Sequence, residues 1–455
     1  MQTYVTQPYA ANKKFYFLPL VAAFAARVAS VLFIDKSLMN PAPGLPGILM
    51  EYGVIAKNML AGSGFAYSWF AVDGHAVVVT TAYMPPGQVW IDYFCLSLFG
   101  NSSAGVYAVF GVNVILSVLS VLMIGKLTRE FFATDRLEKI ALWCAALYPP
   151  FLYATATFGI TTPVILIASW TMLECVKFIK AFAAGRHSMK YALCASIGFG
   201  ILFYFRGEAP LLLLFTIAYI AWALRKQLRS LLPTIALMIA VPFAMISPWT
   251  IRNYTVLDRF VLISSNGGFN FWRGNNALTT GSPWTESGSP LWATDEQRTK
   301  LEQYLGRPAE FDRESSKMYI NDALSWIKAN PTDAAMLVLK KGLIFWTFDT
   351  RSRMGGTLTY MTIYLVTLLL FLFGLFTIRR DKTSSFGIRL ILLWTIVATV
   401  IAMIFFPLPR LQVLMIAAYF PIVAYGTDAA LQRLPLFRKI VCFFFIYFRR
   451  IICQH

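Results

Sequence analysis

The chain has 455 residues, of which 58% are hydrophobic and only 14% are charged, and its formal net charge is +18. A soluble domain of this length would carry roughly a quarter charged residues, so the composition excludes an ordinary soluble protein. Several apolar runs of about 20 residues could each cross a ~30 Å hydrocarbon core as a helix. They predict an all-α polytopic membrane protein rather than a β-barrel, in which apolar and polar residues would alternate.

We expect about ten transmembrane helices, within a range of roughly nine to thirteen. The first apolar run should be an uncleaved span, because Arg27 interrupts it and no Ala-x-Ala cleavage site closes it. Arg27 should face the bundle interior, since a lipid-facing arginine is costly. The predicted spans are 15–34, 104–124, 138–156, 160–178, 190–205, 209–224, 231–249, 357–378, 387–405 and 411–427.

The basic residues are distributed unevenly about these spans. With the N-terminus inside, more than half of the 40 Lys and Arg residues fall on one face, and the other face is close to neutral. The positive-inside rule then predicts a cytoplasmic N-terminus. The basicity is expected to set this orientation and to attract anionic lipid, and nucleic acid is not an expected partner.

The span pattern divides the chain into a membrane part and a small cap made from two large extracytoplasmic loops. No repeated halves are visible, although many transporters are built from them. The predicted organisation is a transmembrane region at 1–250 with a catalytic first loop at 35–103, a cap subdomain at 251–356, C-terminal transmembrane helices at 357–430, and a basic cytoplasmic tail at 431–455.

Both loops contain predicted elements. In the first, a turn-rich stretch at 40–47 precedes a short amphipathic helix at 48–60, and an interfacial helix begins after Pro85-Pro86. In the second, charged helices near 295–304 and 309–329 precede an amphipathic surface helix at 333–348. The basic, aromatic tail indicates an interfacial helix on the inner leaflet, because its apolar run is too short to cross.

Candidate chemistry in the first loop centres on Glu51. A carboxylate in a locally apolar helix at the membrane interface is well placed as a general base, and a solvated carboxylate on the polar helix face is the alternative. Asp73-Gly-His75 is typical of a solvated turn, with an acid/base or metal role as the weaker alternative. Asp92 lies in an apolar run and either points to water or joins the site.

Residues 248–276 are the richest polar stretch, with three arginines, five asparagines and three glycines. This composition suits an anionic, hydroxyl-rich ligand at a membrane surface. Arg252 lies at the membrane exit and is a phosphate candidate, whereas Arg259 and Arg273 lie farther into the loop and are expected to be ordinary surface charges. The candidates to contact the hydroxyls of such a ligand, whether it is a sugar or an acceptor, are Tyr52, Tyr83, Asn266, Asn270, Asn275 and Asn276.

Three other cations are candidate phosphate ligands. Arg206 either pairs with Glu208 or lines a phosphate cavity, and Arg410 lies at the outer end of a span at the same expected depth. Lys341 lies on the predicted surface helix, where lipid headgroup contact is the alternative. The six cysteines form no metal pattern, and no Walker loop is present, so no metal site, nucleotide or other cofactor is predicted.

Four passages together resemble bacterial GT-C glycosyltransferases of the protein-mannosyltransferase and aminoarabinose-transferase type. They are EYGVIAKNMLAGSGF (51–65) with TTAYMPPGQVW (80–90), ALYPPFLYATATF (146–158), FRGEAPLLLL (205–214), and the 248–276 stretch with KGLIFW (341–346). The resemblance implies transfer of a sugar from a polyprenyl-phosphate carrier to an acceptor hydroxyl on a lipid, polysaccharide or protein, with inversion. It also implies a location in a bacterial inner membrane.

The resemblance also implies that Glu51 is the first-loop acid that acts as the base or positions the substrates. Two departures reduce the number of acids. Ile48 stands where relatives often have aspartate, and Thr161-Thr162 stand where an acid often follows Tyr-Pro-Pro. A transporter or flippase for a lipid-linked glycan is the alternative function, since it would need the arginines but no base, and a non-catalytic scaffold is a second.

Overall fold

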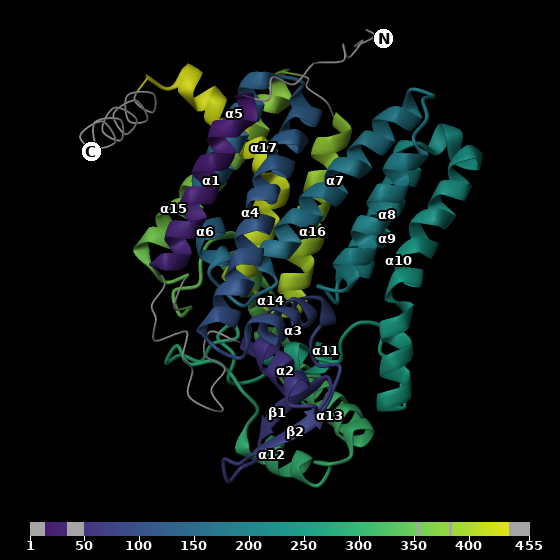
Figure 1. The fold of residues 1–455 in the computed structure, drawn as a ribbon, viewed down its shortest axis with the longest axis vertical. Helices are drawn as coiled ribbons and strands as arrows, with labels where there is room; N and C mark the ends of the chain where they lie inside the picture. The colour runs from purple at the N-terminus through teal and green to yellow at the C-terminus, as the bar shows by residue number, and fades with distance from the viewer. Residues whose placement is uncertain (1–13, 34–49, 353–354, 382–384, 436–455) are drawn as a thin grey trace.

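A computed structural model describes residues 14–33, 50–352, 355–381 and 385–435, and Figure 1 shows a helical bundle with a smaller cap at one end. The first helix begins and the last helix ends at the bundle end opposite the cap. The predicted turn-rich stretch at 40–47 and the tail after residue 435 lie outside the described residues.

The bundle helices correspond to the predicted spans, one helix to each, with a single exception. The span predicted at 138–156 divides at Tyr148, whose backbone is extended (ψ 111°) because the following Pro149 disfavours the helical conformation. The helices are α1 (Lys14–Leu32), α4 (Ser103–Phe132), α5 (Asp135–Leu147), α6 (Pro149–Thr155), α7 (Thr161–Ala183), α8 (Met189–Phe203), α9 (Ala209–Ala223), α10 (Leu228–Leu257), α15 (Leu358–Asp381), α16 (Ser385–Ile404) and α17 (Pro409–Arg433).

Among the described residues, five helices are long and apolar enough to cross a membrane. They are α1, α4, α15, α16 and α10 with the short 3₁₀ turn Arg225–Gln227 before it, and α8 and α9 are shorter apolar helices beside them. The chain is therefore a multi-pass α-helical membrane protein, as predicted. How many helices cross, and in which direction, remains a prediction.

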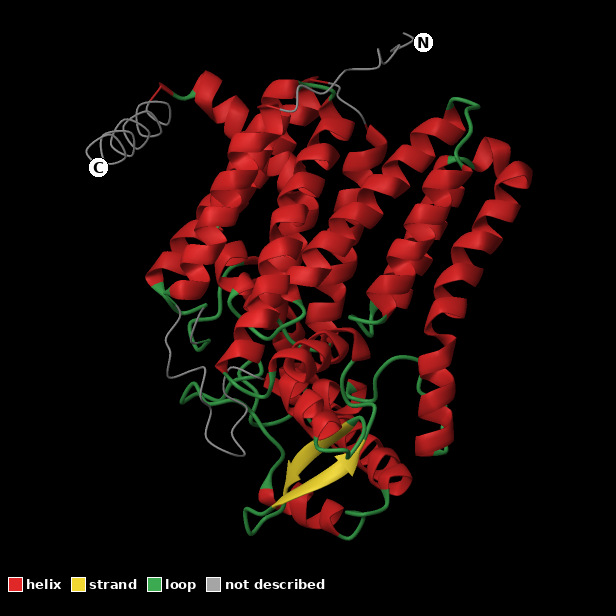
Figure 2. Ribbon diagram, viewed as in Figure 1, coloured by secondary structure: helices red, strands yellow, loops and turns green. Residues whose placement is uncertain are grey.

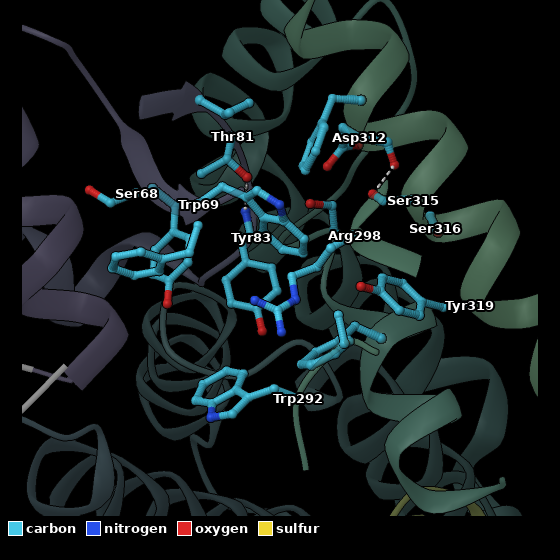
Figure 3. Close-up of a pocket in the computed structure, with 17 residues that line it drawn as sticks. Ser68, Trp69, Thr81, Tyr83, Trp292, Arg298, Asp312, Ser315, Ser316 and Tyr319 are labelled. Atoms are coloured by element: carbon cyan, nitrogen blue, oxygen red, sulfur yellow. Dashed lines mark hydrogen bonds between the residues drawn. The ribbon is translucent and has the colours of Figure 1, made fainter. Parts of the chain in front are cut away.

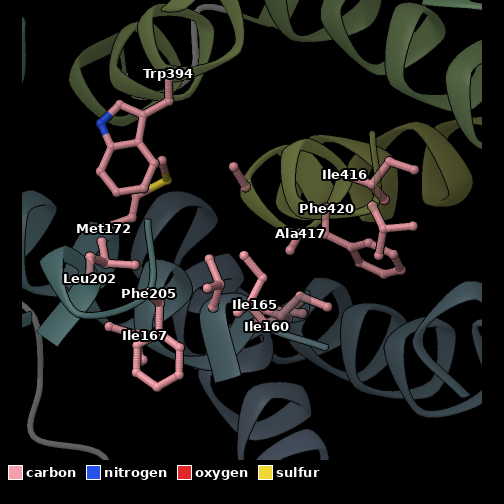
Figure 4. Close-up of a cluster of buried hydrophobic side chains, with 14 of the residues drawn as sticks. Ile160, Ile165, Ile167, Met172, Leu202, Phe205, Trp394, Ile416, Ala417 and Phe420 are labelled. Carbon is pink, nitrogen blue, oxygen red and sulfur yellow. The ribbon is translucent and has the colours of Figure 1, made fainter. Parts of the chain in front are cut away.

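The bundle packs around one apolar core. Figure 4 shows side chains of α7, α8, α16 and α17 converging on it, among them Ile165, Leu202, Trp394 and Phe420, all of which are buried. The expectation for Arg27 is also met, because its side chain is fully buried inside the bundle. Its guanidinium donates to Ser117 Oγ at 2.6 Å and to the Ala146 carbonyl at 2.8 Å, which replaces the water it has lost.

Glycines allow α15 and α17 to approach closely. A Cβ on Gly426 would lie 2.0 Å from the Leu370 carbonyl oxygen, and one on Gly374 would lie 2.4 Å from that of Ile422. Small residues at a helix interface permit such backbone approach in membranes, where lipid supplies no hydrophobic driving force between helices.

Gly426→Ala is therefore expected to destabilise the protein by about 1–3 kcal/mol, the usual cost of overpacking. Thermal unfolding in detergent would measure this loss. Gly111→Ala on α4 is the matched control, because a Cβ there meets nothing within 4 Å. Equal melting temperatures for the two variants would contradict the close packing of α15 and α17.

The cap contains every helix that was predicted in the two loops. It also contains elements that were not predicted: the helix α11 and a two-stranded antiparallel sheet, shown in yellow in Figure 2. Its elements are α2 (Met50–Leu60), β1 (Ala66–Phe70), β2 (Ala76–Thr80), α3 (Pro86–Phe99), α11 (Gly267–Gly274), α12 (Asp295–Glu302), α13 (Pro308–Ala329) and α14 (Pro331–Trp346).

The hairpin pairs Ala66 with Thr80 and Phe70 with Ala76. Its turn carries Gly74 at φ +87°, a conformation that glycine adopts without strain. Asp73 and His75 pair with each other in this turn, and their side chains are 68% and 62% exposed. The structure thus supports the solvated-turn interpretation and places both residues in the turn between β1 and β2.

Candidate active site

Glu51 is half-buried near the start of α2, and its charge acts on residues from several other segments. Burial raises the pKa of Tyr67 and of Tyr83, and the negative charge of Glu51 makes the next largest contribution to both. Burial lowers the pKa of Arg273, and the negative charge of Glu51 opposes this lowering. Glu51 therefore shares one electrostatic environment with the hairpin residue Tyr67, with Tyr83 after the hairpin, and with α11.

Tyr52, the next residue on α2, links this environment to the bundle. Its side chain is 3% exposed, and burial raises its pKa to about 12. The positive charges of Arg410 and Arg206 oppose that rise, and the charges of Glu51 and Asp92 add to it. Arg206, Arg410 and Glu51 therefore all lie within electrostatic range of Tyr52, and the predicted common membrane depth of the two arginines stays a prediction.

The two carboxyl groups near Tyr52 differ in their surroundings. Asp92 on α3 is fully buried, and burial raises its pKa well above the usual carboxyl value, although a hydrogen bond from Gln88 Nε2 at 2.7 Å opposes this. Burial of this kind disfavours the charged carboxylate, which is the form that a base requires. Asp92 thus points inward rather than to water, and Glu51 remains the better candidate for a base.

Arg273 is a correction to the sequence analysis, which expected an ordinary surface charge. Its guanidinium lies 5.4 Å from the Phe269 ring, 5.5 Å from the Trp292 ring and 5.4 Å from the Phe406 ring, measured to the centroids. It donates one long hydrogen bond, of 3.3 Å, to the Pro283 carbonyl. A guanidinium held by aromatic faces keeps most of its hydrogen-bond donors for a ligand. Arg259, by contrast, pairs with Asp312 at 2.6 Å.

Arg252 has partners other than the predicted phosphate. It donates to the Thr81 carbonyl at 2.7 Å and to the Phe65 carbonyl at 3.2 Å. Its guanidinium also lies 5.0 Å from the Trp249 ring centroid. These contacts fasten α10 to the hairpin, so the geometry favours a structural role for Arg252 over phosphate binding.

Lys341 also has hydrogen-bond partners within the protein. Its side chain is fully buried, burial lowers its pKa to about 7, and its ammonium donates to Asn275 Oδ1 at 2.8 Å. The Asn275 amide donates in turn to the Phe271 and Ile404 carbonyls. Lys341 and Asn275 therefore join α14, α11 and the end of α16, and neither is free to bind phosphate or sugar.

The other candidates on or beside α11 differ in availability. Asn276 donates to the Trp272 carbonyl at 2.6 Å and accepts from the Leu278 amide, which commits it to the helix end. Asn266 and Asn270 are half-buried. Gly268 is needed for packing, since a Cβ there would lie 2.8 Å from the Ser316 carbonyl oxygen of α13.

Arg206 and Glu208 form the ion pair that the sequence analysis gave as one alternative. Both side chains keep some exposure, 16% and 29%. A pair at the edge of a site can still lend its cation to a ligand. Among the described residues, no three His, Cys, Asp or Glu side chains are grouped closely enough to hold a metal ion.

Two cavities adjoin residues described above, although Glu51, Arg273 and Arg410 line neither of them. The first, about 380 Å³, lies in the cap between the hairpin, α11 and α13, and Tyr67 and Tyr83 line it (Figure 3). The second, about 550 Å³, is a mostly apolar groove that runs along 259–268 from Gly207, beside Arg206, to Phe405 at the end of α16. Ser265 and Ser316 line both, so a thin wall separates them.

Comparison with known proteins agrees with this architecture. Residues 83–251 match the family model of dolichyl-phosphate-mannose-protein mannosyltransferases. The apo oligosaccharyltransferase of Archaeoglobus fulgidus superposes with a TM-score of 0.56 at 15% identity, over 94% of this chain and 52% of that one. The chain has the fold of that oligosaccharyltransferase, a GT-C fold, as the sequence analysis predicted.

Two further GT-C structures match. AglB from A. fulgidus in complex with an inhibitory peptide and a dolichol-phosphate has a TM-score of 0.54 at 15% identity, over 97% of this chain and 54% of that one. ArnT from Cupriavidus metallidurans bound to undecaprenyl phosphate has a TM-score of 0.41 at 12% identity, over 92% and 78%, which is too low to support a conclusion. The chain spans about half the length of the archaeal structures. No curated protein sequence matches it.

The family match covers only part of the candidate site. The matched stretch, 83–251, contains Arg206 and Asp92 but ends before Arg273 and Arg410 and begins after Glu51. The roles of those three residues therefore rest on their geometry. Arg273 was missed from the sequence although a signal existed: it lies four residues after Phe269, which is one helical turn if α11 is recognised.

Proposed function

We propose that this chain is an inverting glycosyltransferase that moves a sugar from a polyprenyl-phosphate carrier to an acceptor hydroxyl. The observation that carries the proposal is Glu51, a half-buried carboxylate of the cap at one end of a membrane bundle, whose charge, like that of Arg410, acts on both Tyr52 and Arg273. We place the chain in a bacterial inner membrane because of the resemblance to bacterial glycosyltransferases, and the site on the extracytoplasmic face because the opposite face is positively charged.

The proposed reaction is a single displacement. Glu51 takes the proton from the acceptor hydroxyl, and the acceptor oxygen attacks the anomeric carbon of the donor sugar from the face opposite the phosphate. The bond between the anomeric carbon and the phosphate oxygen breaks, and the polyprenyl phosphate leaves with the electron pair. The arginines stabilise the charge that develops on the leaving phosphate.

The apolar groove offers a route for the carrier lipid. Its walls include Phe260, Leu262, Ile320 and Phe405, and it begins at Gly207, next to Arg206. A prenyl chain could lie along these walls while its phosphate meets the arginines. In this placement Arg273 contacts the phosphate. The sequence analysis had instead predicted Arg252 and Lys341 as phosphate contacts.

The proposal is tested with the full chain in lipid nanodiscs and a radiolabelled polyprenyl-phosphate sugar, supplied as separate hexosyl and pentosyl donors. Acceptors are extracted envelope lipid, polysaccharide and protein fractions. We expect free polyprenyl phosphate and label in one acceptor fraction. In sealed vesicles, movement of intact labelled donor across the membrane without cleavage would instead favour the flippase alternative.

A further inference from the structure

The cap cavity has features that catalysis on the donor does not require. Its lining comes mainly from the hairpin and α13, and Figure 3 shows Ser68 and Trp69 of the hairpin and Tyr319 of α13 around it. Aromatic rings make up much of its lining, with Trp69, Tyr83, Trp292 and Tyr319 around it. Its volume of about 380 Å³ is in the range of pockets that bind small molecules.

Polar atoms buried at this cavity have no protein partner. Tyr319 is 3% exposed, and neither its hydroxyl nor the Trp69 indole Nε1 has a hydrogen-bond partner within the described part of the chain. The Nε of Arg298 is in the same state. Figure 3 shows the Tyr319 phenol directed into the cavity. Buried donors without partners are rare and costly, so they point to a ligand that supplies the missing bonds.

The charges at the cavity indicate a neutral ligand. Asp312 is paired with Arg259 at 2.6 Å. Arg298 is paired with Asp295 at 2.5 Å through one of its terminal guanidinium nitrogens. The remaining polar groups are hydroxyls, among them Ser68, Ser315 and Ser316. Aromatic faces beside hydroxyl and N–H groups match a molecule with apolar C–H faces and many hydroxyls.

We propose that this cavity binds a neutral saccharide unit of the acceptor. The proposal rests on the proposed glycosyltransferase function and narrows its acceptor to a glycan-bearing molecule. Tyr67 and Tyr83 belong to the cavity wall and also respond to the charge of Glu51. A saccharide in the cavity would therefore contact tyrosines that lie within electrostatic range of the carboxylate proposed as the base. A peptide acceptor fits less well, because the unsatisfied groups are single side-chain donors rather than a row of backbone groups.

Binding is measured on the full chain in nanodiscs, because maltoside detergents would themselves present sugars to the cavity. The probes are methyl glycosides of glucose, mannose, galactose and arabinose, cellotriose, and a capped serine-containing hexapeptide. Saturation-transfer NMR identifies the ligand and tryptophan fluorescence gives its Kd. We expect at least one saccharide to bind, and Tyr319→Phe to raise its Kd about three- to tenfold, the worth of one neutral hydrogen bond.

The matched control is Tyr254→Phe, the same change at an exposed position on α10. It should leave Kd unchanged, while Tyr319→Phe should melt no lower than the wild type because it removes an unsatisfied buried hydroxyl. Trp69→Phe, which deletes the other unpaired donor, should weaken binding as well. Failure of every saccharide to bind, binding of the hexapeptide instead, or unchanged Kd in both cavity variants would overturn the proposal.

A Glu51→Gln arm separates this inference from the proposed function. We expect that variant to bind the saccharide with the wild-type Kd while it transfers no sugar. The cavity proposal alone would be rejected if the wild type transferred sugar but substitution of Tyr319 and Trp69 left the Kd for the saccharide unchanged. Saccharide binding that depends on them, without transfer from any donor, would reject the function alone.

Discussion

Glu51→Gln is expected to lower kcat for sugar transfer by roughly 10²- to 10⁴-fold, the usual contribution of a positioned general base. Glutamine keeps the size and polarity of the side chain but cannot take the acceptor proton. Donor binding should persist, because the arginines that hold the phosphate are unchanged. Single-turnover release of labelled polyprenyl phosphate in nanodiscs measures the chemical step directly.

Two control variants make this result specific. Glu310→Gln changes an exposed glutamate that pairs with Arg307 on the cap surface, and its transfer rate should stay at the wild-type value. Asp92→Asn changes the buried carboxyl near Tyr52, and its effect should be much smaller than that of Glu51→Gln. If Glu51→Gln kept full turnover and Asp92→Asn were inactive, Asp92 rather than Glu51 would be identified as the base.

Arg273→Gln is expected to reduce kcat/KM for the donor by roughly 10²- to 10³-fold, as when one preorganised donor to a developing anion is removed. The aromatic rings around Arg273 hold its guanidinium without neutralising it, so its charge remains available to the leaving phosphate. Steady-state kinetics with the radiolabelled donor measures the loss.

Arg307→Gln serves as the matched control, because Arg307 is an exposed cap arginine whose partner is Glu310. Arg273→Lys tests the geometry: it preserves charge but not the planar fork, so it should recover only part of the activity. If Arg273→Gln and Arg307→Gln were equally active, Arg273 would be the ordinary surface charge that the sequence first indicated.

Much of the fold was predictable because membrane helices follow a strong and local rule. Every predicted span has a helix, and the cap helices at 295–302 and 308–329 begin where proline or a Thr-x-x-Gln capping box indicates. The hairpin was missed because its two strands of five residues depend on the packing of their cap neighbours, which no local pattern of the sequence reveals.

The candidate site was predictable only in part, and arginine shows why. Arg252 and Arg273 lie in the same polar stretch and differ little in local sequence character. The structure directs Arg252 onto two backbone carbonyls and directs Arg273 toward aromatic rings in the neighbourhood of Glu51. That distinction depends on where Thr81, Phe65 and Trp292 lie in three dimensions, which their spacing along the chain does not specify.

The thin wall between the two cavities has a thermodynamic consequence. Ser265 and Ser316 contact both spaces, and the Arg259–Asp312 pair joins a residue of one lining to a residue of the other. A ligand that shifts these side chains in one cavity changes the free energy of binding in the other, and linkage requires the effect to be equal in both directions. Binding of the donor would then change the affinity for the acceptor, and binding of the acceptor would change the affinity for the donor by the same factor.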